Sequence, residues 1–233
     1  MMPPVAILAG GLSTRMRPVT EGLPKALLPV AGKPFAVHQI ELLRRNGMTD
    51  LVFCVGHLGN LIVEAIGDGA QFGVRVRYSF DGPTLLGTGG ALIRALPYLG
   101  ERFFTLYGDA YLDCDYAAVA ARFSESGAPG LITIFRNADR WDRSNVEFVD
   151  GQIVAYDKNQ RTARMQYIDY GLGMLTRAPL QGYPPGQFLD LGTVYQDLVA
   201  RRQLAGFEVA KRFYEVGSPS GLEETERYLE RSR

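Results

Sequence analysis

The chain has 233 residues, which is enough for one sizeable α/β domain or at most two small ones. Apolar residues make up 46% and charged residues 21%, as in ordinary folded proteins, and the formal net charge is zero. Net charge therefore gives no reason to expect a nucleic acid or a membrane surface as a partner. No apolar run approaches the roughly 18 residues that span a bilayer. Residues 1–9 also lack the basic region and long apolar segment of a cleavable leader.

The two cysteines bear on the cellular compartment. Cys54 lies in an apolar run, and Cys114 lies among aspartates. This usage fits a reducing environment better than a disulfide framework. We therefore expect a cytoplasmic protein, and the sequence leaves open whether it forms a homo-oligomer.

The first segment of the chain combines a strand with a polar loop. Residues 5–9 are a short apolar run that ends at Gly10-Gly11, which predicts a buried central strand entering a tight turn. Two adjacent glycines let the backbone approach a ligand with no Cβ in the way. Hydroxyl groups and cationic side chains follow in the same stretch: Ser13, Thr14, Arg15, Arg17 and Lys25. This combination predicts a binding site for a polyphosphate.

Neither common phosphate-binding motif is present in this stretch. A Walker loop requires Gly-x-x-x-x-Gly-Lys-Ser/Thr, and no lysine follows a second glycine at that spacing. The dinucleotide fingerprint Gly-x-Gly-x-x-Gly is also missing after the strand.

The remaining elements are predicted from apolar periodicity and from helix stop signals. Helices are expected at residues 34–46, 60–66, 90–99, 115–126, 193–202 and 219–231, and strands at 51–55, 74–78, 103–107 and 130–135. This alternation predicts βαβ units and a mostly parallel sheet. Short strands at 145–149, 152–156, 167–169 and 172–176 predict a small antiparallel lid. No repeat or linker divides the chain, so we expect one domain over residues 1–233.

Residues 8–30 resemble the signature of the sugar-1-phosphate nucleotidyltransferases. The family pattern is Leu-Ala-Gly-Gly-x-x-Thr-Arg-Met/Leu-x-Pro-x-Thr, followed by Pro-Lys-x-Leu-x-Pro-Val, and the chain matches it almost without gaps. The alternative is a strand and an arginine-rich surface loop of an unrelated α/β protein. The resemblance implies the nucleotide-diphospho-sugar transferase fold, a Rossmann-like α/β fold whose mixed, mostly parallel sheet carries flanking helices and an antiparallel sugar-binding lid.

The resemblance also implies roles for the residues around the signature. Arg15 would contact the leaving pyrophosphate, and Lys25 the α-phosphate. The nucleotide would lie against Leu8, Ala9, Gly10, Gly11, Ser13, Thr14, Gly87 and Thr88. Thr88 could equally be a helix N-cap among permissive glycines. Where the family often has a glutamine for the base, this chain has Ser79-Phe80-Asp81-Gly82, so the identity of the base stays open from the pocket alone.

Asp109 is the expected magnesium ligand. Gly108-Asp109 follows a predicted central strand, and open α/β sheets place ligand groups there. A carboxylate can hold Mg²⁺ against phosphate oxygens, although an aspartate after a strand is often only a helix cap. The resemblance favours the metal role and adds Glu215, in Glu-Val-Gly-Ser-Pro, where the family more often has Asp or Asn. Whether Glu215 would bind the metal directly or through water is left open.

The second half of the chain supplies the residues that the resemblance assigns to the sugar. They are Asn145, Glu147, Asp157, Lys158, Asp169 and Tyr170. The Asp157-Lys158 pair resembles the family's Glu-Lys, in which the acid takes sugar hydroxyls and the lysine takes the sugar phosphate. A charged turn is the simpler alternative.

Residues 136–170 look most like the short guanylyltransferases that act on D-glycero-α-D-manno-heptose 1-phosphate. This resemblance implies that GTP and the heptose 1-phosphate give a GDP-heptose and pyrophosphate, with Mg²⁺ as cofactor, for capsule or other surface polysaccharide. Two alternatives remain. One is a uridylyl- or thymidylyltransferase for a hexose or amino-sugar 1-phosphate. The other is a non-catalytic nucleotide-sugar sensor on the same fold.

Overall fold

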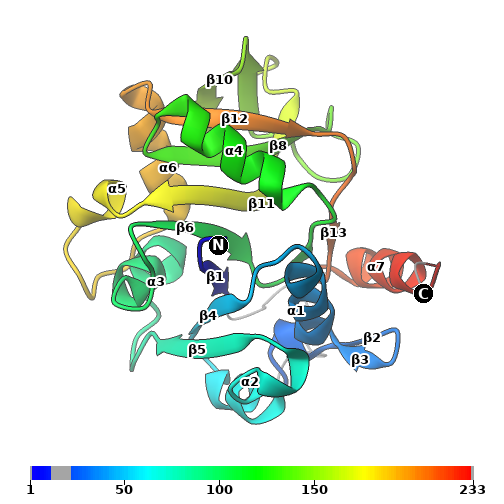
Figure 1. The fold of residues 1–233 in the computed structure, drawn as a ribbon. Helices are drawn as coiled ribbons and strands as arrows, with labels where there is room; N and C mark the ends of the chain where they lie inside the picture. The colour runs from blue at the N-terminus through cyan, green and yellow to red at the C-terminus, as the bar shows by residue number, and fades with distance from the viewer. Residues whose placement is uncertain (1, 12–21, 232–233) are drawn as a thin grey trace.

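The structure is a computed structural model that describes residues 2–11 and 22–231. Its short apolar runs form a nine-stranded sheet with the order β5-β4-β1-β6-β11-β8-β12-β10-β9 (Figure 1). The strands are β1 (Val5–Leu8), β4 (Asp50–Val55), β5 (Arg75–Phe80), β6 (Arg102–Tyr107), β8 (Gly130–Arg136), β9 (Val146–Val149), β10 (Gln152–Tyr156), β11 (Tyr167–Thr176) and β12 (Leu204–Val209).

The two halves of the sheet differ in strand direction. β1 is parallel to β4 and to β6, with Val5 opposite Leu51 and Phe104, and β4 is parallel to β5. β11 is antiparallel to both β6 and β8, while β12 runs parallel to β8. β9 and β10 form an antiparallel hairpin at the far edge. The expected fold class, a mixed α/β sheet with an antiparallel lid, is confirmed.

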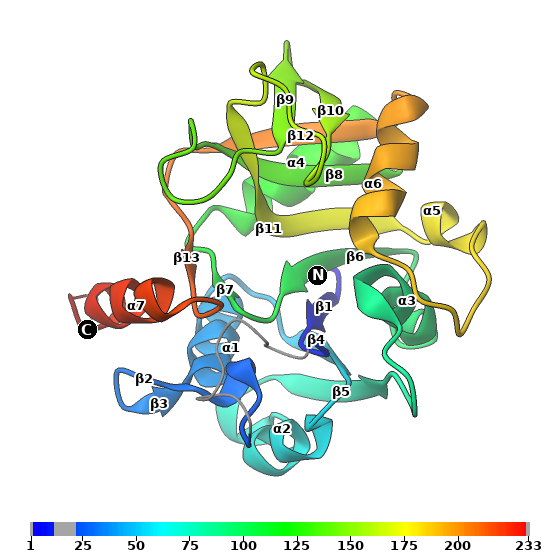
Figure 2. The ribbon, with the colours of Figure 1, turned by 180° about the vertical axis from the view of Figure 1, so that it is seen from behind.

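Helices cover both faces of this sheet (Figures 1 and 2). α1 (Phe35–Arg45), α2 (Gly59–Ile66) and α4 (Tyr116–Ser126) bury side chains in one core. α3 (Gly87–Ala95), α5 (Ala178–Gln181) and α6 (Leu191–Ala200) contribute to a second core on the other face. α7 (Pro219–Arg231) packs beside the β2–β3 hairpin (Pro29–Val30 and Lys33–Pro34), where its Leu229 is buried. No helix among the described residues is long and apolar enough to cross a membrane.

The bounds predicted for two elements are wrong: the strands at 167–169 and 172–176, and the helix at 90–99, which ends at Ala95. Glycine is involved in both elements. The strands expected at 167–169 and 172–176 are one strand, β11, because Gly171 at φ 96° forms an irregularity inside the strand and does not end it. The helix expected from residue 90 begins at Gly87. Its first turn is glycine-rich because Leu189 packs there: a Cβ on Gly87 would lie 2.6 Å from the Leu189 carbonyl oxygen.

The strand order explains where a ligand can bind. The chain passes from β1 outward through β4 and β5, and then returns to the other side of β1 as β6. All four strands are parallel, so their carboxyl ends meet at one edge of the sheet. Open α/β sheets bind ligands in the crevice at such a reversal of strand order.

Candidate active site

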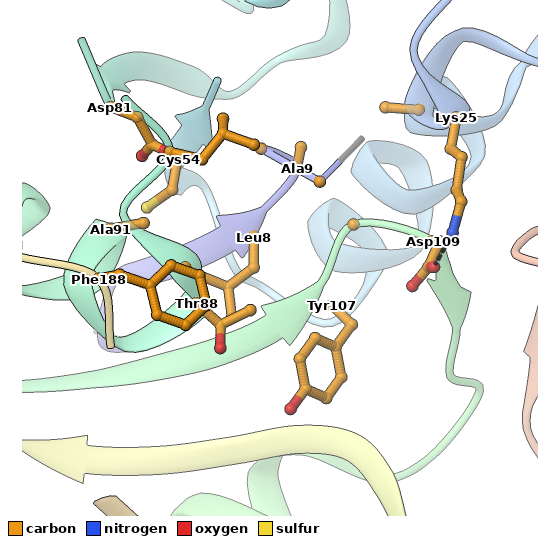
Figure 3. Close-up of a pocket in the computed structure, with 16 residues that line it drawn as sticks. Leu8, Ala9, Lys25, Cys54, Asp81, Thr88, Ala91, Tyr107, Asp109 and Phe188 are labelled. Carbon is orange, nitrogen blue, oxygen red and sulfur yellow. Dashed lines mark hydrogen bonds and ion pairs between the residues drawn. The ribbon is translucent and has the colours of Figure 1, made fainter. Parts of the chain in front are cut away.

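A cavity of about 410 Å³ opens at this edge of the sheet. Figure 3 shows that its two ends differ in chemistry. One end is mainly apolar and is lined by Leu8, Cys54, Ala91 and Phe188, with the carboxylate of Asp81 beside them. The other end carries Lys25 and Asp109, and Tyr107 lies between the two. The shape and polarity of the cavity therefore suit a ligand with an apolar head and an anionic tail.

Most of the residues predicted to bind the nucleotide line this cavity. They are Leu8, Ala9, Gly10, Gly11, Lys25, Gly87, Thr88 and Asp109. Ser13, Thr14 and Arg15 lie outside the described residues. Gly108 brings the ends of β6 and β1 together: a Cβ there would lie 2.8 Å from the Leu8 carbonyl oxygen and 3.0 Å from the Ala9 Cα. The glycine is required for this close backbone approach.

The charged end is built around an ion pair. Lys25 Nζ lies 2.9 Å from Asp109 Oδ2, and the two side chains are 16% and 33% exposed. Lys25 opens a 3-10 turn (Lys25–Leu27) directly after Pro24, and Asp109 follows β6. Because both groups line the cavity, an anionic ligand can reach the lysine and a cation can reach the aspartate.

Glu215 joins this pair through strand pairing. β13 (Tyr214–Glu215) is antiparallel to β7 (Ala110–Tyr111), which places Glu215 opposite Ala110, next to Asp109. A Cβ on Gly217 would lie 2.7 Å from Glu215 Oε2, 3.0 Å from Asp109 Oδ2 and 3.2 Å from Lys25 Nζ. The three charged groups therefore converge around Gly217, and a side chain at that position would occupy the space between them.

The two carboxylates suit a magnesium ion whose other ligands would be substrate phosphates and water. Asp109 and Glu215 both offer oxygen ligands, and Glu215 already accepts hydrogen bonds from the Gly217 N–H and the Ser218 hydroxyl. No cluster of three or more His, Cys, Asp or Glu side chains suited to a metal occurs among the described residues. Mg²⁺ commonly uses one or two carboxylates together with substrate phosphates and water, so this donor set is sufficient.

Gln39, which sequence reasoning missed, supports the turn that carries Asp109. It lies on α1 with 1% of its surface exposed. Its side-chain Nε2 donates hydrogen bonds to the carbonyl oxygens of Tyr107 at 3.1 Å and Ala110 at 2.7 Å. These carbonyls flank Gly108-Asp109, so the amide fixes both ends of the turn. A glutamine on an amphipathic helix gives no sequence signal for this role.

Thr88 caps a helix other than its own. Its Oγ1 accepts a hydrogen bond of 2.8 Å from the N–H of Leu191, at the start of α6. The Leu189 carbonyl oxygen accepts from the N–H groups of Gly89 and Gly90. These contacts hold the segment before α6 against α3 and place Phe188, 72% exposed, at the apolar end of the cavity. Phe188 was also missed, because a contact across about a hundred residues leaves no local sequence signal.

Asp169 is the predicted sugar residue that lies closest to the cavity. It lines a small adjoining hollow together with Leu8 and Tyr107, which also line the main cavity. Its carboxylate accepts hydrogen bonds from the Tyr156 hydroxyl at 3.0 Å and the Gly171 N–H at 3.0 Å. Burial raises the pKa of Asp169, and the nearby Lys158 ammonium and the Gly171 N–H oppose this shift.

Asn145 and Lys158 both interact with Asp169. Asn145 Oδ1 accepts a hydrogen bond of 2.9 Å from the Asp169 N–H. The Lys158 ammonium lies 5.5 Å from the centre of the Tyr107 ring. Asn145, Lys158 and Asp169 are therefore brought together beside the cavity, as an amide, a cation and an anion.

The other three predicted sugar residues are occupied by structural contacts. Glu147 forms an ion pair of 3.2 Å with Arg164. The Asp157 carboxylate accepts from the N–H groups of Gln160 and Asn159, and these hydrogen bonds lower its pKa. Tyr170 is 2% exposed and packs in the core with α1, α2 and α4. It lies on the opposite side of β11 from Asp169, because side chains alternate along a strand.

The family assignment agrees with this geometry. The sequence profile described as "Nucleotidyl transferase" matches residues 5–145, so the chain belongs to the nucleotidyl transferase family. The resemblance to sugar-1-phosphate nucleotidyltransferases is thereby confirmed. The chain spans about half the length of the first curated relatives that it matches, 52% and 49%.

Two relatives and one solved structure illustrate the range of the family. An N-acetylmuramate α-1-phosphate uridylyltransferase of Neisseria meningitidis is 42% identical over 113 residues, which cover 48% of this chain and 49% of the relative. A D-glycero-α-D-manno-heptose 1-phosphate guanylyltransferase of Campylobacter jejuni is 27% identical over 172 residues, 73% of this chain and 75% of the relative. The crystal structure of HddC from Yersinia pseudotuberculosis complexed with GMP-PN matches with a TM-score of 0.80 at 22% identity, over 98% of this chain and 100% of that chain. At that identity the likeness concerns the fold.

Proposed function

We propose that the protein transfers a nucleotidyl group from a nucleoside triphosphate to a sugar 1-phosphate and releases pyrophosphate. We propose GTP and D-glycero-α-D-manno-heptose 1-phosphate as its substrates. The observation that carries the proposal is the Lys25–Asp109 pair at one end of a cavity whose other end is mainly apolar. A triphosphate placed with its phosphates at the pair would have its base at the apolar end.

The reaction needs positioning and charge neutralisation more than a general base. An oxygen of the sugar phosphate attacks the α-phosphorus, and the bond to the β-phosphate oxygen breaks as pyrophosphate leaves. The attacking phosphate monoester is already an anionic nucleophile. Lys25 would neutralise charge on the α-phosphate, which grows in the transition state. Arg15 stays a prediction from the sequence for the leaving pyrophosphate.

Asp109 and Glu215 would hold Mg²⁺ at the charged end. The ion, when bound, neutralises phosphate charge and aligns the triphosphate. Lys25 pairs with Asp109, so Lys25 is held beside the position that the phosphates would take. The pair thereby orients both charged groups before the substrates arrive.

The sugar 1-phosphate would bind in the main cavity near Tyr107, on the side where Asp169 lies. The Lys158 ammonium is the cation that opposes the raised pKa of this carboxylate. It would pair with the sugar phosphate, while Asp169 would accept hydrogen bonds from sugar hydroxyls and the Asn145 NH₂ group would donate to them. The heptose is supported by the resemblance of residues 136–170 and by the Campylobacter relative.

A uridylyltransferase for an amino-sugar 1-phosphate is the second candidate. The specific observation in its favour is the Neisseria relative, which is 42% identical over 113 residues. The matched stretch covers 48% of this chain, and the heptose relative matches 73%. The two candidates share one mechanism and differ in the base and in the sugar.

The test is pyrophosphate release in the presence of Mg²⁺. GTP, UTP, dTTP, CTP and ATP are crossed against heptose, mannose, glucose and N-acetyl amino-sugar 1-phosphates. Release with GTP and the heptose supports the full proposal, whereas release with UTP or dTTP keeps the mechanism and discards guanine. No release from folded protein across the grid would favour the nucleotide-sugar sensor.

A further inference from the structure

The carboxylate of Glu215 lies against the first turn of α7. Its Oε1 accepts a hydrogen bond from the Ser218 hydroxyl, and its Oε2 accepts one from the Gly217 N–H. Ser218 directly precedes α7 and caps it, because its Oγ accepts from the Gly221 N–H at 3.0 Å. One hydroxyl therefore connects the start of this helix to a carboxylate at the charged end of the cavity.

Gly221, in the first turn of α7, leaves the space that this carboxylate occupies. A Cβ on Gly221 would overlap the Oε1 and Cδ atoms of Glu215 and would lie 2.8 Å from the Glu215 carbonyl oxygen. Glycine is a poor helix former compared with alanine, so its presence inside a helix needs a reason. The contact with the Glu215 side chain provides one.

The main chain of Glu215 is fixed from two sides. Thr225, in α7, has none of its surface exposed, and its hydroxyl hydrogen is shared by the carbonyl oxygens of Glu215 at 2.8 Å and Gly221 at 2.7 Å. On the other side, the Val216 N–H donates to the Asp109 carbonyl oxygen at 2.9 Å. The backbone that carries Glu215 is therefore held between α7 and the turn that carries Asp109.

α7 is itself fixed to the body of the protein. Leu229 is buried beside the β2–β3 hairpin, and Glu226 Oε1 accepts a hydrogen bond of 3.1 Å from the Ala31 N–H. Figure 2 shows the helix beside β13 and this hairpin. The first turn of α7 is therefore a rigid support for the Glu215 carboxylate.

The two oxygens of this carboxylate have different neighbours. Oε1 faces Ser218 and Gly221, whereas Oε2 lies near Gly217, around which Asp109 Oδ2 is also placed. An ionised carboxylate has about four lone-pair positions on its two oxygens. Oε2 can therefore accept the Gly217 N–H and still bind a cation.

We propose that Ser218 and Gly221 are positioning residues that orient Oε2 of Glu215 toward the magnesium position, an inference that rests on the proposed function. Ser218 holds Oε1 against the helix, and Gly221 leaves room for it. Glycine at position 221 and glutamate at position 215 then form a matched pair, because the longer acid reaches the helix only where a side chain is absent.

The experiment measures the affinity for Mn²⁺, a spectroscopic substitute for Mg²⁺, by electron paramagnetic resonance with and without GTP. Gly221→Ala should weaken Mn²⁺ binding about 10- to 100-fold, the range for groups that orient a metal ligand. The Mg²⁺ concentration for half-maximal pyrophosphate release should rise by the same factor. Glu223→Ala is the control, since it places alanine at an exposed position of the same helix.

A double variant tests whether the two positions act as a pair. Aspartate is shorter than glutamate by one methylene, so Glu215→Asp leaves the space that the methyl group of Gly221→Ala takes. Gly221→Ala should therefore weaken Mn²⁺ binding much less in the Glu215→Asp background than in the wild type. The contact with the carbonyl oxygen of residue 215 is the same in both backgrounds and does not produce this difference. Equal losses in the two backgrounds would overturn the pairing.

Ser218→Ala tests the hydroxyl separately. It removes both the donor to Glu215 and the cap of α7, and we expect Mn²⁺ binding to weaken about tenfold. Asp115→Ala is the matched control, because Asp115 caps α4 by accepting from the Ala118 N–H at 2.9 Å. Both variants should lower the melting temperature, but only Ser218→Ala should change the affinity for Mn²⁺. An unchanged affinity in Ser218→Ala would overturn the role of the hydroxyl.

Mn²⁺ binding separates this inference from the proposed function. If the variants weaken Mn²⁺ binding as described and no sugar phosphate reacts with any nucleotide, the inference holds and the transferase proposal fails. If the wild type releases pyrophosphate but Gly221→Ala binds Mn²⁺ as tightly as the wild type, the inference fails and the transferase proposal holds. A wild type that binds no Mn²⁺, with or without GTP, also overturns the inference.

Discussion

The proposed nucleotide side and the proposed sugar side of this site differ in how their polar groups are paired. On the nucleotide side, backbone glycines and the Lys25–Asp109 pair line a cavity of about 410 Å³. On the sugar side, the polar residues bond to one another: Tyr156 and Asn145 to Asp169, and Glu147 to Arg164. The proposed nucleotide side is an open cavity. On the proposed sugar side, a substrate would have to share or replace the hydrogen bonds and the ion pair that the side chains already form.

This difference separates the parts of the site by their expected sensitivity. Side chains that line the cavity and stabilise the charge developing in the transition state affect the rate of the chemical step. Side chains that already hydrogen-bond to one another affect how tightly the sugar binds. Each hydrogen bond that they form with the sugar replaces one within the protein. Substitutions on the two sides should therefore change different kinetic constants.

The largest effect is expected at the charged end of the cavity. Lys25→Ala or Asp109→Ala should keep the fold and lower kcat by about 100- to 1000-fold, because in the proposed mechanism Lys25 neutralises phosphate charge and Asp109 holds the Mg²⁺ that does the same. Steady-state pyrophosphate release measures this loss. Lys33→Ala is the control, since Lys33 forms a 2.6 Å ion pair with Glu41 and both side chains are more than a third exposed. Near-normal kcat in Lys25→Ala would remove the lysine from the mechanism.

Asp169→Asn should act on sugar binding. We expect KM for the sugar 1-phosphate to rise about 10- to 100-fold, the range for hydrogen bonds to a charged group, while KM for the nucleotide changes little. Initial rates with each substrate varied in turn distinguish the two constants. Asp197→Asn is the control, because Asp197 also accepts from a tyrosine, Tyr183, but in an exposed pair. An equal rise in both KM values would mean that Asp169 affects nucleotide binding as much as sugar binding, which contradicts the prediction.

Gln39→Leu tests the support beneath Asp109. The change leaves the Tyr107 and Ala110 carbonyls without their donor and frees the turn that carries the aspartate. We expect kcat to fall about tenfold with KM for the nucleotide unchanged, because small displacements of a catalytic group are costly. Gln71→Leu, which removes a weak 3.4 Å hydrogen bond to Ile66, is the control. A lower melting temperature with unchanged kcat would restrict Gln39 to a structural role.

More of the residues predicted for the nucleotide than of those predicted for the sugar lie at the cavity, and the reason is physical. Residues 5–11 and 108–109 are strand ends followed by loops, and parallel strands bring such loops together by topology alone. The sugar side depends on exact register. Asp169 and Tyr170 are neighbours in sequence but lie on opposite faces of β11, so at most one of them can face the cavity.

Contacts between distant segments account for what the sequence could not provide. Gly217 lies among Lys25, Asp109 and Glu215 because β13 pairs with β7, and each of these strands has only two residues. Phe188 reaches the cavity through hydrogen bonds to α3, about a hundred residues earlier. Asp81 lies in the segment Ser79-Phe80-Asp81-Gly82, which differs from the glutamine that the family often has for the base. Its burial and its unpaired oxygen are visible only in the structure.

The smallest effect concerns the stability of the folded protein and is expected at Asp81, at the apolar end of the cavity. The pKa of Asp81 is raised by burial above its ordinary value of 3.8. Between the unfolded and folded pKa values the folded protein binds more protons than the unfolded chain, so stability falls as pH rises through that window. Asp81→Asn removes this titration and should raise the melting temperature of the ligand-free protein at pH 7 to 8 by about 2–4 °C, which corresponds to about 1 kcal/mol. The gain should shrink as the pH approaches 4. Asp150→Asn is the control and should show no such trend, because Asp150 is exposed and asparagine tolerates its positive φ of 48°. A gain that is constant with pH would assign the effect to some cause other than the Asp81 charge.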